Sequence, residues 1–232
     1  MKSPLISIVV PSYNQSEFLL EALDSVWQQT VHPYELIIVD DGSTDNSYEI
    51  AERWKEEHGY RLPTILVRQV NKGLASARNT GIMNATGDYI LPLDADDKLF
   101  PYAIEEIVKE IEATGADIIA PSLRTFGLSS VVTILDKNLT LESFRAVNRM
   151  GYFSAFRRSK ALEVGGYSPK MVYGYEDLHF WIDLLKRGAT ISVIQEPLVY
   201  YRIKESSMMT ESVQHHGDLW EQITKDHPEL WT

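Results

Sequence analysis

The first half of the chain alternates short, unbroken apolar runs with segments in which apolar residues recur every three or four positions. An unbroken run of aliphatic and β-branched residues is typical of a strand that is buried on both faces of a parallel sheet. Such runs predict strands at 6–11, 35–40, 64–70 and 89–93. The helical spacing between them predicts helices at 16–29, from 43 or 45 to 58, and at 74–85.

The second half is less regular, and its elements follow no strict alternation. Apolar periodicity predicts helices at 101–113, 141–147, 176–187 and 213–225. Shorter runs predict strands at 116–121, 130–135, 152–158 and, in two pieces around Pro197, at 191–203. No linker, repeat or low-complexity tract separates the halves. We therefore expect a single domain, 1–232, made of two fused halves, 1–97 and 98–232, with a helix at the end of the second.

The order of elements predicts an α/β fold with a doubly wound, mainly parallel central sheet flanked by helices. In such sheets, ligands bind beyond the carboxyl ends of the strands. Four consecutive predicted strands end in polar or flexible groups, at 11–14, 40–43, 71–73 and 94–97. These four strand ends outline one binding crevice.

The net charge and the lack of cysteine exclude several kinds of partner and active site. The 232 residues carry a formal net charge of −11 and include no cysteine. The charge argues against a nucleic-acid backbone as partner, and the lack of cysteine excludes disulfides, thiolate metal sites and cysteine nucleophiles. The first residues contain no apolar run long enough for a signal peptide, and no window reaches the roughly 20 apolar residues of a membrane span. We expect a cytoplasmic protein, with peripheral membrane contact and oligomeric state left open.

Asp94 and Asp96 are the first candidates for chemistry. Residues i and i+2 of an extended chain point the same way, so two carboxylates at a strand end make a hard oxygen site for Mg²⁺ or Mn²⁺. Because Mg²⁺ commonly takes its remaining ligands from water and phosphate oxygens, the pair predicts a metal-bridged diphosphate site. The sequence lacks both GxxxxGK[ST] and GxGxxG, which excludes a Walker-type NTPase and a dinucleotide-binding fold.

Two further segments add candidate residues. A carboxylate of VDDGSTDNS, Asp40 or Asp41, could accept the N3–H of uracil, although the segment also reads as a turn with a helix cap. In NKGLASARNTG, Lys72 and Arg78 could balance phosphate charge, with a glycine between them that permits close backbone approach; a solvated loop is the alternative.

The predicted helix at 176–187 begins with a third acidic pair. Acidic residues in a first helical turn are favoured by the helix dipole, which explains Glu176 and Asp177 without any chemistry. The rival interpretation is that one of them is a general base.

Taken together, these segments resemble the family 2 glycosyltransferases of GT-A fold. The resemblance is carried by ISIVVPSYNQSEFLLEALDSVWQQT, ELIIVDDGSTDNS, NKGLASARNTGIMNATGDYILPLDADD, GGYSPKMVYGYEDLHFWIDLLKRG and, more loosely, YYRIKESSM. It covers 6–97 almost continuously and 153–207 in patches. It implies a Rossmann-like GT-A sheet and transfer of a sugar, with anomeric inversion, from a nucleotide-diphosphate sugar.

The resemblance also implies roles for individual residues. A nucleoside pocket is implied for Pro11, Tyr13, Asn14, Asp40 and Asp41, with Asp41 or Asp40 reading uracil. Neighbours of the base and diphosphate are implied at Lys72, Gly73 and Arg78, and the metal-binding DxD motif at Asp94 and Asp96. Asp177 matches the catalytic base, and Glu176 is the second choice.

The sequence departs from the family pattern at Lys204 and His179. Lys204 stands where the family commonly has a histidine near the metal or diphosphate, so we expect its charge over the diphosphate; an exposed lysine is the alternative. His179 occupies a position where an acidic residue is common, and we expect it on the helix surface or packed. His215 and His216 are expected to be solvated.

The implied partners are a UDP-sugar donor and a saccharide or lipid-linked saccharide acceptor, in the synthesis of a bacterial surface polysaccharide or glycoconjugate. Two alternatives stay open: a nucleotidyltransferase that makes nucleotide sugars, and a glycosyltransferase-like binding module without activity. The first usually needs a glycine-rich basic loop after the first strand, and PSYNQSE is neither. The second is disfavoured because all three candidate aspartates, Asp94, Asp96 and Asp177, are present.

Overall fold

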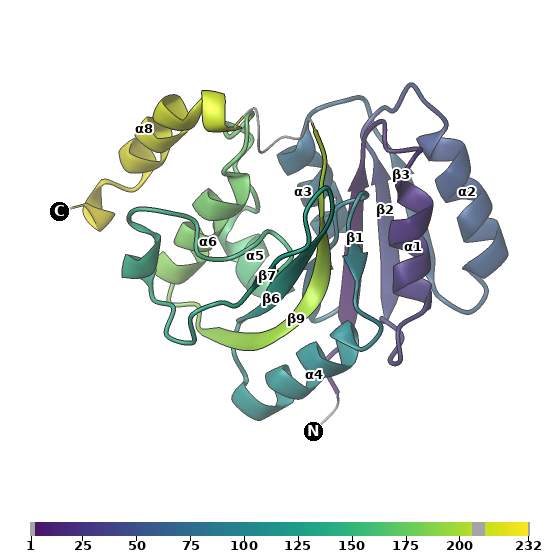
Figure 1. Cartoon of the computed structure of the whole chain (residues 1–232), viewed down its shortest axis with the longest axis horizontal. Helices are drawn as coiled ribbons and strands as arrows, with labels where there is room; N and C mark the ends of the chain where they lie inside the picture. The colour runs from purple at the N-terminus through teal and green to yellow at the C-terminus, as the bar shows by residue number, and fades with distance from the viewer. Residues whose placement is uncertain (1–2, 206–211, 232) are drawn as a thin grey trace.

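A computed structural model describes residues 3–205 and 212–231 of the chain. Within these residues, one curled, mixed sheet of nine strands runs through the whole molecule in the order β3-β2-β1-β4-β8-β6-β9-β5, with β7 added to β6 (Figure 1). Helices flank it, with α1 and α2 at one end of the molecule and α8 at the other (Figure 1). The predicted single α/β domain is therefore confirmed.

The first four strands are parallel and follow the predicted positions closely. They are β1 (Ile6–Ser12), β2 (Glu35–Asp40), β3 (Thr64–Arg68) and β4 (Tyr89–Pro92). The helices that connect them are α1 (Leu19–Trp27), α2 (Ser47–His58) and α3 (Leu74–Asn84). Every residue of β1, β2 and β4 is buried, which explains why their sequences show no polar alternation.

The second half completes the sheet with strands of both directions. They are β5 (Lys98–Leu99), β6 (Ile118–Gly127), β7 (Val132–Thr133), β8 (Ala155–Arg157) and β9 (Ile191–Ile203). β8 lies antiparallel between β4 and β6, β6 and β9 form a long parallel pair, and β5 is antiparallel to β9. β7 pairs antiparallel with β6, within the segment predicted as a strand at 130–135. The helices are α4 (Ala103–Thr114), α5 (Arg158–Val164), α6 (Glu176–Lys186) and α8 (His216–Asp226), with 3-10 turns η1 (Leu141–Phe144) and η2 (Pro228–Leu230).

Two hydrophobic layers cover the two faces of the sheet. On one face, alternate residues of β1 such as Ile8 and Val10 pack with residues of α1, α2 and α4, including Leu23 and Trp54. On the other face, Val9 packs in the layer that contains residues of α3, α6 and α8. Because strand side chains alternate between faces, unbroken apolar strands feed both layers at once.

Several predicted boundaries are wrong. The first helix begins at Leu19, not at 16, because the N–H of Ser16 is bound to Asp45 Oδ2 at 3.0 Å and the chain there forms a turn. The predicted helix at 141–147 is only the short η1, and 191–203 is one bent strand, since register shifts next to Ser122 of β6 absorb the Pro197 region. β5 and α5 were not predicted, and two-residue strands and seven-residue helices carry too little periodicity to show. The C-terminal helix α8 starts at His216, and residues 212–214, at the start of the predicted helix, are also helical, with a turn at 215 between them.

No helix among residues 3–205 and 212–231 is long and apolar enough to cross a membrane.

Candidate functional site

Arg78 of α3 joins the polar groups of three separate segments. Its side chain is 1% exposed, its Nη2 lies 2.7 Å from Asp94 Oδ1, and its Nη1 lies 2.5 Å from Glu176 Oε1. The guanidinium also lies over the rings of Tyr152 and Tyr167, at 4.8 and 5.4 Å from their centroids. This cation therefore links the end of β4 to the start of α6, and the carboxylate of Glu176 is engaged in an ion pair with it.

The surroundings of Arg78 perturb the carboxylate of Asp94. Burial raises the pKa of Asp94 to about 6, and the attraction of Arg78 only partly offsets that effect. The side chain of Asp94 nevertheless remains 24% exposed. Arg78 was predicted to lie near phosphate. In the structure its buried guanidinium is already paired with two carboxylates, those of Asp94 and Glu176.

The other two aspartates of the loop have different surroundings. Asp96 is 22% exposed, and its Oδ2 lies 2.6 Å from Lys204 Nζ. Asp97 is buried; its carboxylate accepts hydrogen bonds from the Tyr152 hydroxyl at 2.5 Å and from the Arg202 N–H at 2.6 Å. Arg202 Nε also donates to the Asp96 carbonyl at 2.7 Å. Asp97 thus fixes the loop, whereas Asp96 faces the crevice with a lysine against it.

Tyr152 is a residue that the sequence did not single out. Its hydroxyl accepts the backbone N–H of Asp94 at 3.0 Å while it donates to Asp97, and its ring lies under Arg78. Together with Arg202, it fixes the acidic loop at Asp94 and Asp97. A tyrosine in an apolar, alternating segment gives no such signal, since its partners come from 55 or more residues away.

Both carboxylate oxygens of Asp41 accept hydrogen bonds from the segment before α3. Its Oδ1 accepts the Lys72 N–H at 2.9 Å and the Gln69 side chain at 2.7 Å, and its Oδ2 accepts the Gly73 N–H at 2.8 Å. Gly73 has a φ of +85°, in the region that glycine tolerates, and immediately precedes α3. Asp41 therefore links the end of β2 to the start of α3 through backbone groups.

Asp40 differs from its neighbour. Its Oδ2 is 3.2 Å from Arg68 Nε and accepts the Ser43 N–H at 3.3 Å. Its Oδ1 is buried and has no hydrogen-bond partner in the described part of the chain. A buried carboxylate oxygen without a donor is costly, so Asp40 keeps an unused acceptor that Asp41 does not have.

The end of β1 lies against this same corner. Pro11 belongs to β1, and Tyr13 is 46% exposed. Asn14 has a φ of 51°, its N–H donates to Ser43 Oγ at 3.0 Å, and its Oδ1 accepts the Thr44 N–H at 2.8 Å. The structure thus brings the predicted nucleoside residues of β1 and β2 together at one corner of the sheet.

Asp177 begins α6 beside Glu176. Its Oδ2 accepts from Asn148 Nδ2 at 2.8 Å, and its Oδ1 accepts the Leu178 N–H at 2.7 Å. The side chain is partly exposed. Burial, followed by the negative charge of Glu176, raises the pKa of Asp177 to about 7. Such a carboxylate can accept a proton near neutral pH.

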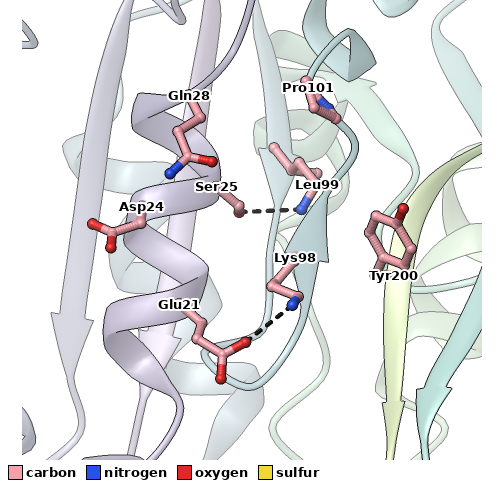
Figure 2. Close-up of a pocket in the computed structure, with 8 residues that line it drawn as sticks. All are labelled: Glu21, Asp24, Ser25, Gln28, Lys98, Leu99, Pro101 and Tyr200. Atoms are coloured by element: carbon pink, nitrogen blue, oxygen red, sulfur yellow. Dashed lines mark hydrogen bonds and ion pairs between the residues drawn. The ribbon is translucent and has the colours of Figure 1, made fainter.

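Two hollows differ in their relation to these residues. A small cavity of about 40 Å³ lies between the start of α3 and the segment 169–176, and Lys72, Gly73 and Glu176 line it. A wider groove of about 370 Å³ lies between α1, β5 and β9 (Figure 2). There Lys98 Nζ lies 3.0 Å from Glu21 Oε2, and the predicted site residues do not contribute to its lining.

The sequence of the chain is similar to those of known glycosyltransferases. The chain is 42% identical over 117 residues to the uncharacterized glycosyltransferase EpsJ of Bacillus subtilis, which covers 50% of this chain and 33% of EpsJ. It is 28% identical over 224 residues to TuaG of the same organism, a glycosyltransferase proposed to act in teichuronic acid biosynthesis, which covers 94% of this chain and 86% of TuaG. The chain thus spans about a third of EpsJ and most of TuaG.

Solved structures share the fold. Residues 1–349 of Staphylococcus aureus TarS in complex with UDP-GlcNAc give a TM-score of 0.76 at 21% identity, covering 89% of this chain and 60% of that one. The mannosyltransferase PcManGT of Pyrobaculum calidifontis, in complex with GDP-Man and Mn²⁺, gives 0.75 at 19% identity, covering 97% and 65%. The predicted GT-A fold is therefore confirmed. Residues 7–179 match the family described as Glycosyl transferase family 2, and the chain belongs to that family.

Proposed function

We propose that the chain transfers a sugar from a UDP-sugar to a hydroxyl group of an acceptor, with inversion at the anomeric carbon. The observation that carries the proposal is the bridge made by Arg78. By holding Asp94 at 2.7 Å and Glu176 at 2.5 Å, it links the acidic loop to the first turn of α6, where Asp177 is the next residue. A donor diphosphate and an acceptor hydroxyl would meet between them.

The nucleotide half of the donor is assigned to the corner of β1 and β2. Asp40 Oδ1 lacks a partner among residues 3–205 and 212–231, and the N3–H of uracil is a donor of the right kind. A buried acceptor atom that binds an N–H group disfavours a base without that N–H, because the acceptor is then left without a hydrogen bond. The TarS complex contains a uridine donor and the PcManGT complex a guanosine donor, so the fold admits both bases; the ring N–H that Asp40 would bind is present in uracil and guanine and absent from cytosine and adenine.

Asp94 and Asp96 would hold a divalent cation, Mn²⁺ or Mg²⁺. Both are partly exposed at a strand end, at 24% and 22%, and two carboxylate ligands with room for phosphate oxygens fit such an ion. When bound, it would supply positive charge to the departing diphosphate. Lys204, 2.6 Å from Asp96, lies where its ammonium group can share that charge with the diphosphate.

Asp177 is assigned as the general base. The acceptor oxygen forms its bond to the anomeric carbon while the bond to the diphosphate oxygen breaks, UDP leaves with the bonding electrons, and the acceptor proton passes to the Asp177 carboxylate. One in-line displacement of this kind inverts the anomeric carbon. Glu176 would not replace it, because its carboxylate is buried and paired with Arg78.

The acceptor would be a saccharide or a lipid-linked saccharide of a bacterial surface polymer, assembled at the cytoplasmic side of a membrane. The similarity to TuaG over 94% of this chain supports the polymer setting. The acceptor wall is assigned to 98–175, which includes Asn148, the partner of Asp177.

A panel of UDP- and GDP-sugars with Mn²⁺ tests the proposal. Release of UDP and hydrolysis of a UDP-sugar are expected for the wild type, and loss of turnover with donor binding retained is expected for Asp177→Asn. Asp218→Asn is the matched control, because its side chain is 90% exposed. Pyrophosphate formation from UTP and a sugar 1-phosphate would instead indicate a nucleotidyltransferase. Binding that raises the melting temperature without any turnover would indicate a binding module.

A further inference from the structure

A second group of metal-ligating side chains lies away from the acidic loop. His179 and Asp183 are one helical turn apart on α6, and His227 follows α8. One ligand atom from each lies within 4.8 Å of the others. The two imidazoles are buried, 7% and 2% exposed, and their ring centroids are 4.5 Å apart. Two segments distant in sequence therefore contribute to one compact cluster.

The hydrogen bonds of the cluster leave two ring nitrogens unused. His179 Nε2 lies 3.3 Å from Asp226 Oδ2, which assigns the imidazole proton to Nε2 and leaves a lone pair on Nδ1. Nδ1 lies 3.1 Å from Asp183 Oδ2, and it has no hydrogen-bond partner in the described segments. A lone pair that faces a carboxylate oxygen is repulsive unless a proton or a metal ion lies between them.

His227 offers a lone pair on Nδ1, because the ammonium group of Lys186 next to it can only donate, and the imidazole proton then lies on Nε2. Its Nε2 is buried and unpartnered within residues 3–205 and 212–231. Its Nδ1 lies 2.9 Å from Lys186 Nζ and 3.9 Å from Asp183 Oδ1. Lys186 is 28% exposed and is also paired with Glu229, so its flexible side chain can keep its charge at the surface.

We propose that His179, Asp183 and His227 bind one Zn²⁺ ion, with water as the fourth ligand. Two imidazoles and one carboxylate form a donor set suited to Zn²⁺ rather than to Mg²⁺, which prefers oxygen ligands. Asp226 would orient His179 through its other ring nitrogen, as carboxylates commonly do behind zinc-binding histidines. Ligands of a tetrahedral Zn²⁺ ion lie about 3.3 Å apart, so the widest pair of the cluster closes by roughly 1.5 Å.

The ion would connect two segments of the chain. It would join α6, whose first turn contains Asp177, to the segment after α8. The site is separate from Asp94 and Asp96 and does not depend on the proposed function. Zinc binding displaces any proton on the coordinating nitrogens and stabilises the folded chain over the unfolded one.

Titration of chelator-treated, full-length protein with ZnCl₂ tests the proposal. With excess MgCl₂ present to occupy the proposed site at Asp94 and Asp96, we expect one equivalent of bound zinc by elemental analysis and a rise in melting temperature. Asp183→Asn and His227→Asn should abolish both, and Asp226→Asn should weaken zinc binding by about 10- to 100-fold. His32→Asn, at an exposed histidine outside the cluster, and Asp94→Asn should retain the zinc effect. Wild-type affinity in His227→Asn, or no zinc bound by the wild type, would overturn the proposal.

Should the variants fail to fold, zinc X-ray absorption of the wild type decides the matter. Two imidazole nitrogens and two oxygens around the ion are expected. A shell of oxygen atoms alone would place the zinc elsewhere and refute the assignment.

Discussion

Replacing Arg78 by methionine tests the bridge on which the site depends. Methionine roughly preserves the volume but removes the cation between Asp94 and Glu176. Arg78 is 1% exposed, and its partners are 24% and 7% exposed, so the two carboxylates would be left beside each other with limited access to water. Breaking a buried ion pair in this way costs about 3–5 kcal/mol. Because water reaches part of Asp94, we expect a loss near the lower end, about 3 kcal/mol.

The assay is urea unfolding followed by tryptophan fluorescence, with EDTA present so that no metal binds the exposed aspartates. In thermal unfolding of a chain of this size, a loss of about 3 kcal/mol in the free energy of unfolding corresponds to a fall in melting temperature of roughly 6–12 °C. The double variant Arg78→Met/Glu176→Gln should recover part of the loss, because one unpaired charge is then gone.

Arg124→Met is the matched control. Arg124 is exposed on β6, and its replacement should change the free energy of unfolding by less than about 0.5 kcal/mol. If Arg78→Met unfolds within about 1 kcal/mol of the wild type, or if the double variant is no more stable than the single one, the bridge is not what holds these segments together.

Three further predictions follow from the contacts described above. Asp40→Asn should weaken UDP binding at least tenfold in calorimetry, since the uracil N3–H loses a charged acceptor; unchanged affinity would move uracil recognition elsewhere. Lys204→Ala should raise the KM for the donor at limiting Mn²⁺, with partial recovery at excess Mn²⁺, and identical kinetics would remove Lys204 from the site. Burial alone would raise the pKa of Glu35, but hydrogen bonds from Ser7, Thr86 and Gly87 outweigh it and hold the pKa below its usual range. Its stabilising effect is therefore present above the unfolded-state pKa and is lost as pH falls through the lower folded-state pKa. Glu35→Gln should thus cost about 1 kcal/mol at pH 7 and nothing once the wild-type carboxyl is protonated, whereas a constant difference across pH would contradict the reasoning.

Much of the N-terminal half could be predicted from the sequence. Strands such as Ile6–Ser12 and Glu35–Asp40 are buried on both faces, so their apolar runs are unbroken and easily recognised. The rule that ligands bind at the carboxyl ends of parallel strands then gathers Asp40, Asp94 and their neighbours without any knowledge of their contacts.

Only the tertiary structure decided which hydrogen-bond or ion-pair partner each polar side chain has. Asp40 and Asp41 are adjacent and chemically alike, yet one carboxylate is used by backbone N–H groups of the next loop and the other keeps an oxygen without a partner. Arg78 is 98 residues from Glu176, and no local pattern relates them.

The same holds for the histidines. His179 was expected only as a surface or packed residue, and its place beside His227 depends on how the last helix folds back onto α6. The sequence alone determined which apolar strands are buried and at which edge of the sheet the carboxylates gather, because periodicity is a local property of the chain. The pairing of charges was decided by the tertiary structure, since hydrogen bonds and ion pairs depend on distances of about 3 Å that arise only when remote segments pack together.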